Sequence, residues 1–131
     1  MSGIKIPTWI KVFGWVLAIF GLFLGVASYV APDMVISGIT TDTPAQLQAM
    51  GMLGGRNPAM AITLMVALLS KRSGFLMLAF IMRLVTEMTD MVITAKTGIM
   101  GLPAIAVIAI YILLFIVPEI LAIRELQSLT T

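Results

Sequence analysis

The chain has 131 residues, of which 60% are hydrophobic and 11% are charged, and its mean hydropathy is +1.12. A water-soluble domain this small needs far more polar surface. The net charge of +2 comes from scattered side chains, which form no polybasic run that would bind phosphates. These values exclude a soluble enzyme domain, a nucleic-acid binder and a disordered chain. They predict an all-α integral membrane protein whose main partner is the lipid bilayer.

Cysteine and histidine are both absent from the sequence. The usual ligands of zinc, haem and iron–sulfur clusters are therefore missing, and so is thiol redox chemistry. We expect no metal site and no cofactor bound by this chain. Any redox role would need a partner subunit or a diffusible carrier.

The first predicted span covers residues 9–30. Residues 12–30 are apolar and uncharged, and Trp9 and Lys11 before them are typical of a membrane interface. A cleavable signal peptide is the alternative, because Val26-Ala27-Ser28 has the small residues of a cleavage site.

Residues 31–47 form the one predicted extramembrane loop, since they contain two prolines, a glycine, two aspartates and three threonines. Near its end, Thr43 and Pro44 are typical of a helix start. The second predicted span covers residues 48–70 and carries two glycines, an arginine, an asparagine and a proline at 54–58. It is therefore either continuous or broken at that point.

Two further spans are predicted at residues 74–94 and 99–121. Pro118 is expected to end or kink the last helix, which places Glu119 at the membrane interface. Four spans with mostly short connections predict a single transmembrane domain, residues 1–131, folded as an antiparallel four-helix bundle.

Basic residues predict the orientation of this bundle. With the amino terminus in the cytoplasm, only Arg56 and Lys96 lie near the opposite side of the membrane. The excess of basic residues on the inner side predicts that both termini are cytoplasmic, in a bacterial inner membrane. The inner basic residues are Lys5, Lys11, Lys71, Arg72 and Arg124.

Three charged residues, Arg83, Glu87 and Asp90, stand in the middle of the otherwise apolar third span. At 100° per residue they share one helix face, within about 40° of Arg83. Charges at this depth cost about 2.5–3.5 kcal/mol each on insertion scales, so this face is expected to point into the bundle. Arg83 and Glu87 have the i, i+4 spacing of an ion pair.

Residue counts from the turn between the second and third spans place Arg56 level with the two acids of the third span. Arg56 is therefore the predicted partner of the remaining acid, with Asn57 available for hydrogen bonds. Tyr111, midway along the last span, is expected to join this polar cluster through Arg83.

Three interpretations of the polar cluster stay open. It can be structural, fixing the register of the helices. It can line a pocket for a polar headgroup, a quinone or a proton. It can also be catalytic, with Glu87 and Asp90 as the candidate acid and base for opening an epoxide or moving a double bond. No reaction-specific motif accompanies these acids.

Three segments resemble the DoxX-like family of small four-helix integral membrane proteins: residues 55–61 (GRNPAMA), Lys71-Arg72, and residues 83–90 (RLVTEMTD). The resemblance lies in the arginine that starts the second span and in the Arg-x3-acid-x2-Asp pattern of the third. It implies a four-helix membrane fold and a link to quinone-coupled sulfur oxidation, membrane redox complexes or the assembly of other membrane proteins. It implies no catalytic residue.

The small size and the lack of cofactor ligands predict a non-enzymatic accessory or partner-binding subunit, assembled with other membrane proteins or with itself. The alternative is a binding protein for a hydrophobic small molecule, of the quinone or lipid type, or a membrane enzyme. This alternative uses Arg56, Arg83, Glu87 and Asp90, and it predicts a bounded cavity beside them.

Overall fold

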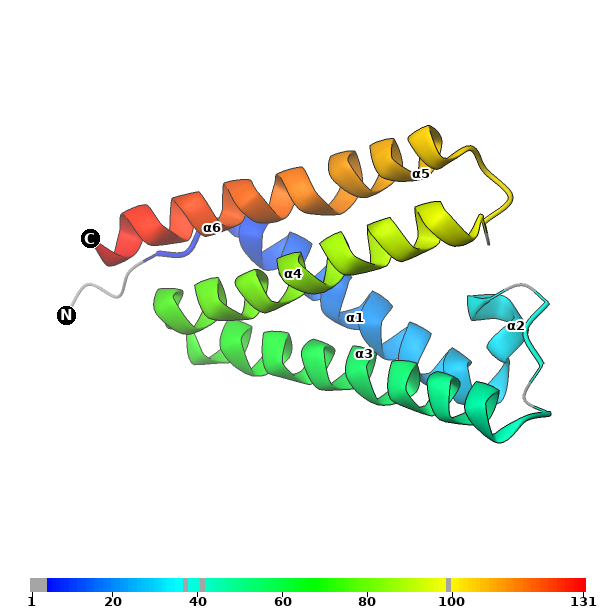
Figure 1. Cartoon of the computed structure of the whole chain (residues 1–131). Coiled ribbons are helices and arrows are strands. Elements are labelled where there is room, and N and C mark those ends of the chain that lie inside the picture. Colours follow the sequence, from blue (N-terminus) through cyan, green and yellow to red (C-terminus); the bar gives the residue numbers. More distant parts are fainter. Residues whose placement is uncertain (1–4, 37, 41, 99) are drawn as a thin grey trace.

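The computed structural model describes residues 5–36, 38–40, 42–98 and 100–131. All regular secondary structure in these residues is helical (Figure 1), as the composition predicts. The helices are α1 (Thr8–Val30), α2 (Pro32–Val35), α3 (Pro44–Ser70), α4 (Ser73–Thr97), α5 (Ala104–Tyr111), the π-helix η1 (Ile112–Ile116) and α6 (Val117–Thr130). The last three follow one another without a break and form one rod.

Three long helices among the described residues are apolar enough to cross a membrane, namely α1, α3 and the rod Ala104–Thr130. Helix α4 is long enough to cross a membrane, but it contains more charged residues than the three apolar helices. Each 18-residue stretch of α4 contains Arg83, Glu87 and Asp90. The predicted third span is therefore the one whose charges need partners from neighbouring helices.

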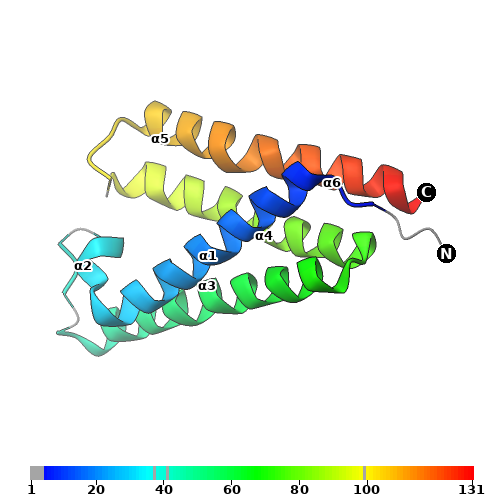
Figure 2. The same cartoon turned by 180° about the vertical axis from the view of Figure 1, so that it is seen from behind.

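The two ends of the molecule carry different segments of the chain. The start of α1, the C-terminus and the α3–α4 turn lie at one end, and α2 and the start of α5 lie at the other (Figure 1). Helix α1 packs along α3, and α4 packs against α3 and the rod. The view from behind shows α1 running diagonally away from α5 (Figure 2). The far halves of α1 and α5 are therefore not packed on each other.

Helix α3 begins at Pro44 rather than at residue 48, so the last residues of the predicted loop are helical. The Gln46 backbone amide donates to the Thr43 hydroxyl at 3.3 Å, and the Thr43 amide donates to the Gln46 side chain at 3.3 Å. This reciprocal capping box satisfies two free amides and fixes the helix start. The predicted loop also contains the short helix α2.

Helix α3 is continuous through residues 54–58, although Pro58 lies inside it. Proline has no amide to donate, so the Gly54 carbonyl loses its usual helical donor. Gly25 of α1 packs against this point: a Cβ on Gly25 would lie 2.5 Å from Pro58 Cδ and 3.4 Å from the Gly54 carbonyl oxygen. The close approach of α1, which needs glycine, therefore covers the weakened turn of α3.

The rod continues through Pro118 to Thr130, so the expectation that Pro118 ends the last helix is wrong. Directly before this proline the helix widens into the π-turn η1, in which the Val117 amide donates to the Ile112 carbonyl. A proline ring crowds the carbonyl four residues earlier in an α-helix. The wider π-turn relieves that crowding, and the helix carries on.

The apolar core lies at the end of the molecule that carries the termini. Ile10 and Leu17 of α1 are buried there against Leu64, Phe80 and other apolar side chains of α3, α4 and α6. The Phe13 and Phe80 rings stack with centroids 6.0 Å apart. Helix α1 is therefore part of this core. Arg56 and Asp90 lie farther from this end, toward α2 and the start of α5.

Candidate functional site

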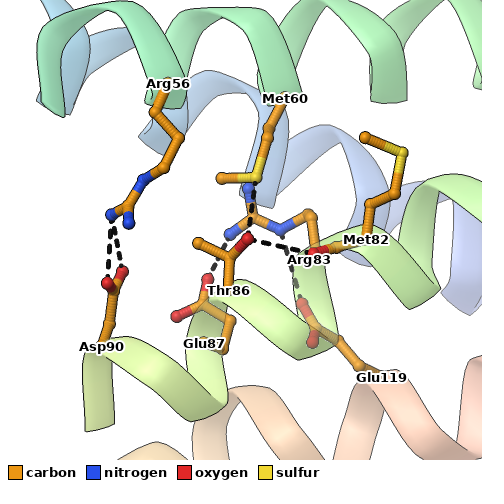
Figure 3. A network of polar contacts seen from close by, with 8 residues as sticks. All are labelled: Arg56, Met60, Met82, Arg83, Thr86, Glu87, Asp90 and Glu119. Carbon is orange, nitrogen blue, oxygen red and sulfur yellow. Dashed lines mark hydrogen bonds and ion pairs between the residues drawn. The ribbon is translucent and has the colours of Figure 1, made fainter. Parts of the chain in front are cut away.

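Arg83 of α4 is the centre of a buried ion-pair network (Figure 3). Its Nη2 donates to Glu87 Oε1 at 2.6 Å, one helical turn along, which is the pair that the i, i+4 spacing predicts. Its Nε donates to Glu119 Oε1 of α6 at 3.4 Å. The three side chains are 5%, 11% and 0% exposed, so this network joins two helices in the interior.

The expectation that Glu119 lies at the membrane interface is wrong, because its side chain is fully buried. That expectation assumed that the last helix ends at Pro118, whereas the helix continues to Thr130. Arg83 lies about 21 Å back from Thr97, and Glu119 lies about 22 Å along from Ala104, at 1.5 Å per residue. A residue count from the connection between α4 and α5 therefore places Arg83 and Glu119 at the same level.

A second ion pair joins α3 to α4 on the other side of Glu87. Arg56 Nη2 donates to both carboxylate oxygens of Asp90, at 3.1 and 3.0 Å. The side chains of Arg56 and Asp90 are 36% and 28% exposed, far more than the Arg83 network. The depth count from the α3–α4 turn had placed these residues level. Figure 3 shows both pairs on the inner face of α4.

Tyr111 does not have the partner expected for it. Among the described residues, no hydrogen bond joins its hydroxyl to Arg83, and its ring packs against Phe115 with centroids 5.7 Å apart. Tyr111 lies about 11 Å from the start of α5, whereas Arg83 lies about 21 Å from the end of α4. Tyr111 is therefore level with Asp90, about two turns away from Arg83.

Thr86 adds a contact between α3 and α4. Its Oγ1 lies 3.0 Å from the Met82 carbonyl oxygen and 3.3 Å from Met60 Sδ, and it donates to these acceptors. Asn57, the remaining predicted residue, is buried on α3, and its backbone carbonyl faces Gly21 of α1. These contacts hold α1, α3 and α4 together around the ion pairs.

A cavity of about 410 Å³ lies beside these residues. It is lined by all six residues predicted for the polar cluster, together with apolar and aromatic side chains from α1, α3, α4, α5 and η1. Glu119 is not in the lining, since it lies on the other side of Arg83. The six predicted residues are Arg56, Asn57, Arg83, Glu87, Asp90 and Tyr111, and the lining also contains the hydroxyl side chains of Thr94 and Thr97.

The chemistry of the cavity is set by these polar groups. In the described part of the chain, no group of three or more metal-binding side chains is suited to hold an ion. The lining contains two guanidinium groups and two carboxylates, and each guanidinium bonds to one of these carboxylates. The cavity can therefore present hydrogen-bond donors and acceptors at one wall while the other walls stay apolar.

Comparison with known protein families, with curated proteins and with solved structures found no match. The likeness to the DoxX-like family therefore rests on the short motifs of the second and third spans alone.

Proposed function

We propose that this chain is a four-helix integral membrane protein whose cavity binds a small amphipathic molecule of the quinone or lipid type. One observation supports this most strongly: a 410 Å³ cavity has ion pairs on one wall and apolar and aromatic side chains on the others. Cavities of about 300–1,000 Å³ with apolar walls and a few converging polar groups are typical of small-molecule sites. A molecule with a polar head and an apolar body fits this division.

The four-span arrangement is supported by the partners of the α4 charges. Arg83, Glu87 and Asp90 each form an ion pair on the inner face of α4. Ionisable groups that pair with one another inside a bundle are compatible with a membrane-spanning helix. Helix α4 therefore crosses beside the three apolar helices.

An even number of spans requires both termini on one side of the membrane, and the start of α1 and the end of α6 lie at one end of the molecule (Figure 1). That end also carries the α3–α4 turn with Lys71 and Arg72. The excess of basic residues there supports cytoplasmic termini, and we place the protein in a bacterial inner membrane.

Binding is better supported than catalysis or an accessory role. Glu87 Oε1 and both Asp90 oxygens already accept hydrogen bonds from guanidinium groups, so the acid–base chemistry predicted for them stays a prediction. The accessory-subunit function also stays a prediction. Exposed apolar side chains cover the outside of the long helices, and lipid or a protein partner would bury them equally well.

The proposal is tested by filling the cavity. Thr94 of α4 lines it, so Thr94→Tyr would occupy the space that a ligand needs. Thr89 of the same helix is exposed and is not in the lining, which makes Thr89→Tyr a matched control. Both variants and the unchanged protein are purified in mild detergent, and the small molecules that each retains are extracted and quantified by mass spectrometry.

We expect one amphipathic species at close to one molecule per chain in the unchanged protein and in Thr89→Tyr, and a loss of most of it in Thr94→Tyr. Equal retention by the two variants would show that the bound molecules lie on the lipid-facing surface, and the proposal would fail.

A further inference from the structure

The polar groups of the cavity divide into an inaccessible set and an accessible pair. The side chains of the Arg83 network are at most 11% exposed. Arg56 and Asp90 are about three times more exposed than that, at 36% and 28%. A ligand that enters the cavity therefore meets Arg56 and Asp90 first, and the Arg83 network holds the wall behind them.

The Arg56–Asp90 pair offers both kinds of hydrogen-bonding group without net charge. Both of its hydrogen bonds use Nη2 of Arg56, so Nη1 has no hydrogen-bond partner among the described residues. Each Asp90 oxygen accepts one bond and keeps a further lone pair. A ligand head that both accepts and donates a hydrogen bond can use the two groups together.

Charged heads are disfavoured by the balance of the lining. Its two guanidinium groups each pair with one of its two carboxylates, and Arg83 also bonds to Glu119 behind the lining, so neither guanidinium is free of an acidic partner. An anionic head that approaches Arg56 also meets Asp90, and a cationic head that approaches Asp90 also meets Arg56. Neither would find an opposite charge that is free, and burying an uncompensated charge is costly.

The apolar part of the cavity lies between two helices. Phe20 and Leu24 of α1 line it from one side, and Ile110 and Phe115 of the rod line it from the other. The rings of Phe20 and Phe115 stack with centroids 6.5 Å apart, which joins α1 to the rod at their level, and beyond them α1 runs away from α5 (Figure 2). The volume of about 410 Å³ is at the small end for ligand sites, so a long chain would extend past these rings between α1 and α5. In a membrane, that side faces lipid.

Resting on the proposed function, we infer that the ligand is an uncharged, single-chain amphiphile with a hydroxyl-type head at the Arg56–Asp90 pair and its chain directed between α1 and α5. The head class follows from the accessible donor and acceptor. That the ligand has a single chain follows from the small volume of the cavity and from its apolar walls on α1 and the rod.

The inference is tested with four probes that share one alkyl chain and differ only in the head. These are an alkanol, its methyl ether, an alkyl sulfonate and an alkyltrimethylammonium. The ether accepts but cannot donate a hydrogen bond, and the last two carry permanent charges. The delipidated full-length protein in mild detergent is mixed with equal amounts of all four, and native mass spectrometry measures the share of each bound probe.

In the unchanged protein we expect the alkanol to be the most abundant adduct. Asp90→Asn leaves Arg56 uncompensated, so the sulfonate should gain about tenfold relative to the alkanol. Arg56→Gln should favour the trimethylammonium probe by a similar factor. Glu125→Gln and Arg72→Gln make the same charge changes outside the cavity lining and should keep the order seen in the unchanged protein.

Should either single variant fail to fold, the neutral double variant Arg56→Gln/Asp90→Asn must keep the alkanol first. A preference of the unchanged protein for the ether or a charged probe, lost in Thr94→Tyr, would overturn this inference while leaving the proposed function intact. Equal binding of all probes by the unchanged protein and Thr94→Tyr would overturn both.

Discussion

Arg83 should be the most costly single residue to remove from this fold. Substitution by methionine keeps much of the volume of the side chain but leaves Glu87 and Glu119 without their shared partner. Both carboxylates are in the interior, with side chains 11% and 0% exposed. Glu119 cannot turn to water without moving α4 or α6, and Glu87 faces only the cavity.

The size of the effect can be worked from the two contacts. Hydrogen bonds to charged groups contribute about 1.5–3 kcal/mol each. The 2.6 Å bond to Glu87 belongs at the upper end of that range, and the 3.4 Å bond to Glu119 at or below the lower end. Removing one partner from a buried ion pair typically costs about 3–5 kcal/mol. We therefore expect Arg83→Met to lose about 3–5 kcal/mol of unfolding free energy.

Replacing the two carboxylates together with the arginine should restore most of the lost unfolding free energy. Buried ion pairs replaced together by apolar residues are often neutral or stabilising. The triple variant Arg83→Met/Glu87→Leu/Glu119→Leu should therefore be more stable than Arg83→Met alone. Arg72→Met, an exposed arginine next to the same helix, is the control and should change stability by no more than about 0.5 kcal/mol.

Reversible unfolding in mixed micelles with increasing sodium dodecyl sulfate, followed by circular dichroism, gives these free energies. A triple variant that is less stable than Arg83→Met would refute the reasoning, because the cost would then come from lost packing and not from unpaired carboxylates. An Arg83→Met protein as stable as the unchanged one would refute the network itself.

Three further predictions concern packing, orientation and partners. Gly25→Ala should lose about 1–3 kcal/mol, since its Cβ would lie 2.5 Å from Pro58 Cδ, whereas Gly55→Ala, whose Cβ meets open space, should be neutral or stabilising. Equal effects of the two in the same unfolding assay would contradict the close packing of α1 on α3. The chain has no native cysteine, so Asp33→Cys and Ser128→Cys give clean reporters of orientation. A membrane-impermeant maleimide applied to intact cells should label only Asp33→Cys, and the reverse pattern would contradict cytoplasmic termini. For the accessory-subunit prediction, native mass spectrometry of the protein extracted from its own membrane should find it bound to other membrane proteins or to itself. A lone monomer would contradict that prediction.

Residue spacing predicted the ion pairs well where two helices share a tight turn. Glu87 follows Arg83 by one helical turn. Arg56 lies about 21 Å from the α3–α4 turn, level with Glu87 and within one turn of Asp90, so Asp90 was left as its partner once Glu87 was paired with Arg83. Glu119 was missed because Pro118 was expected to end its helix. The π-turn that lets the helix continue depends on local backbone geometry, which the apolar sequence around it does not reveal.

The cavity could not be predicted in position or size from sequence. It exists because α1 follows α3 while α5 follows α4, so that the two outer helices separate at one end (Figure 2). The path of α1 depends on how Gly21 and Gly25 fit against Ala61 and Pro58. The angle at which two helices cross arises from the packing between them, and a residue pattern within one helix does not specify it.

The central claim is that an amphiphile binds between α1 and α5 with its head at Arg56 and Asp90, and photo-crosslinking tests this most directly. An alkanol with a photoreactive diazirine near its head is bound to the full-length protein in mild detergent, irradiated, and mapped by peptide mass spectrometry. We predict crosslinks at cavity residues such as Asn57, Thr94 and Tyr111, removed by excess unlabelled alkanol and absent in Thr94→Tyr. Crosslinks confined to exposed outer residues such as Val12, Val66 and Leu113, and unchanged by competition, would contradict the claim.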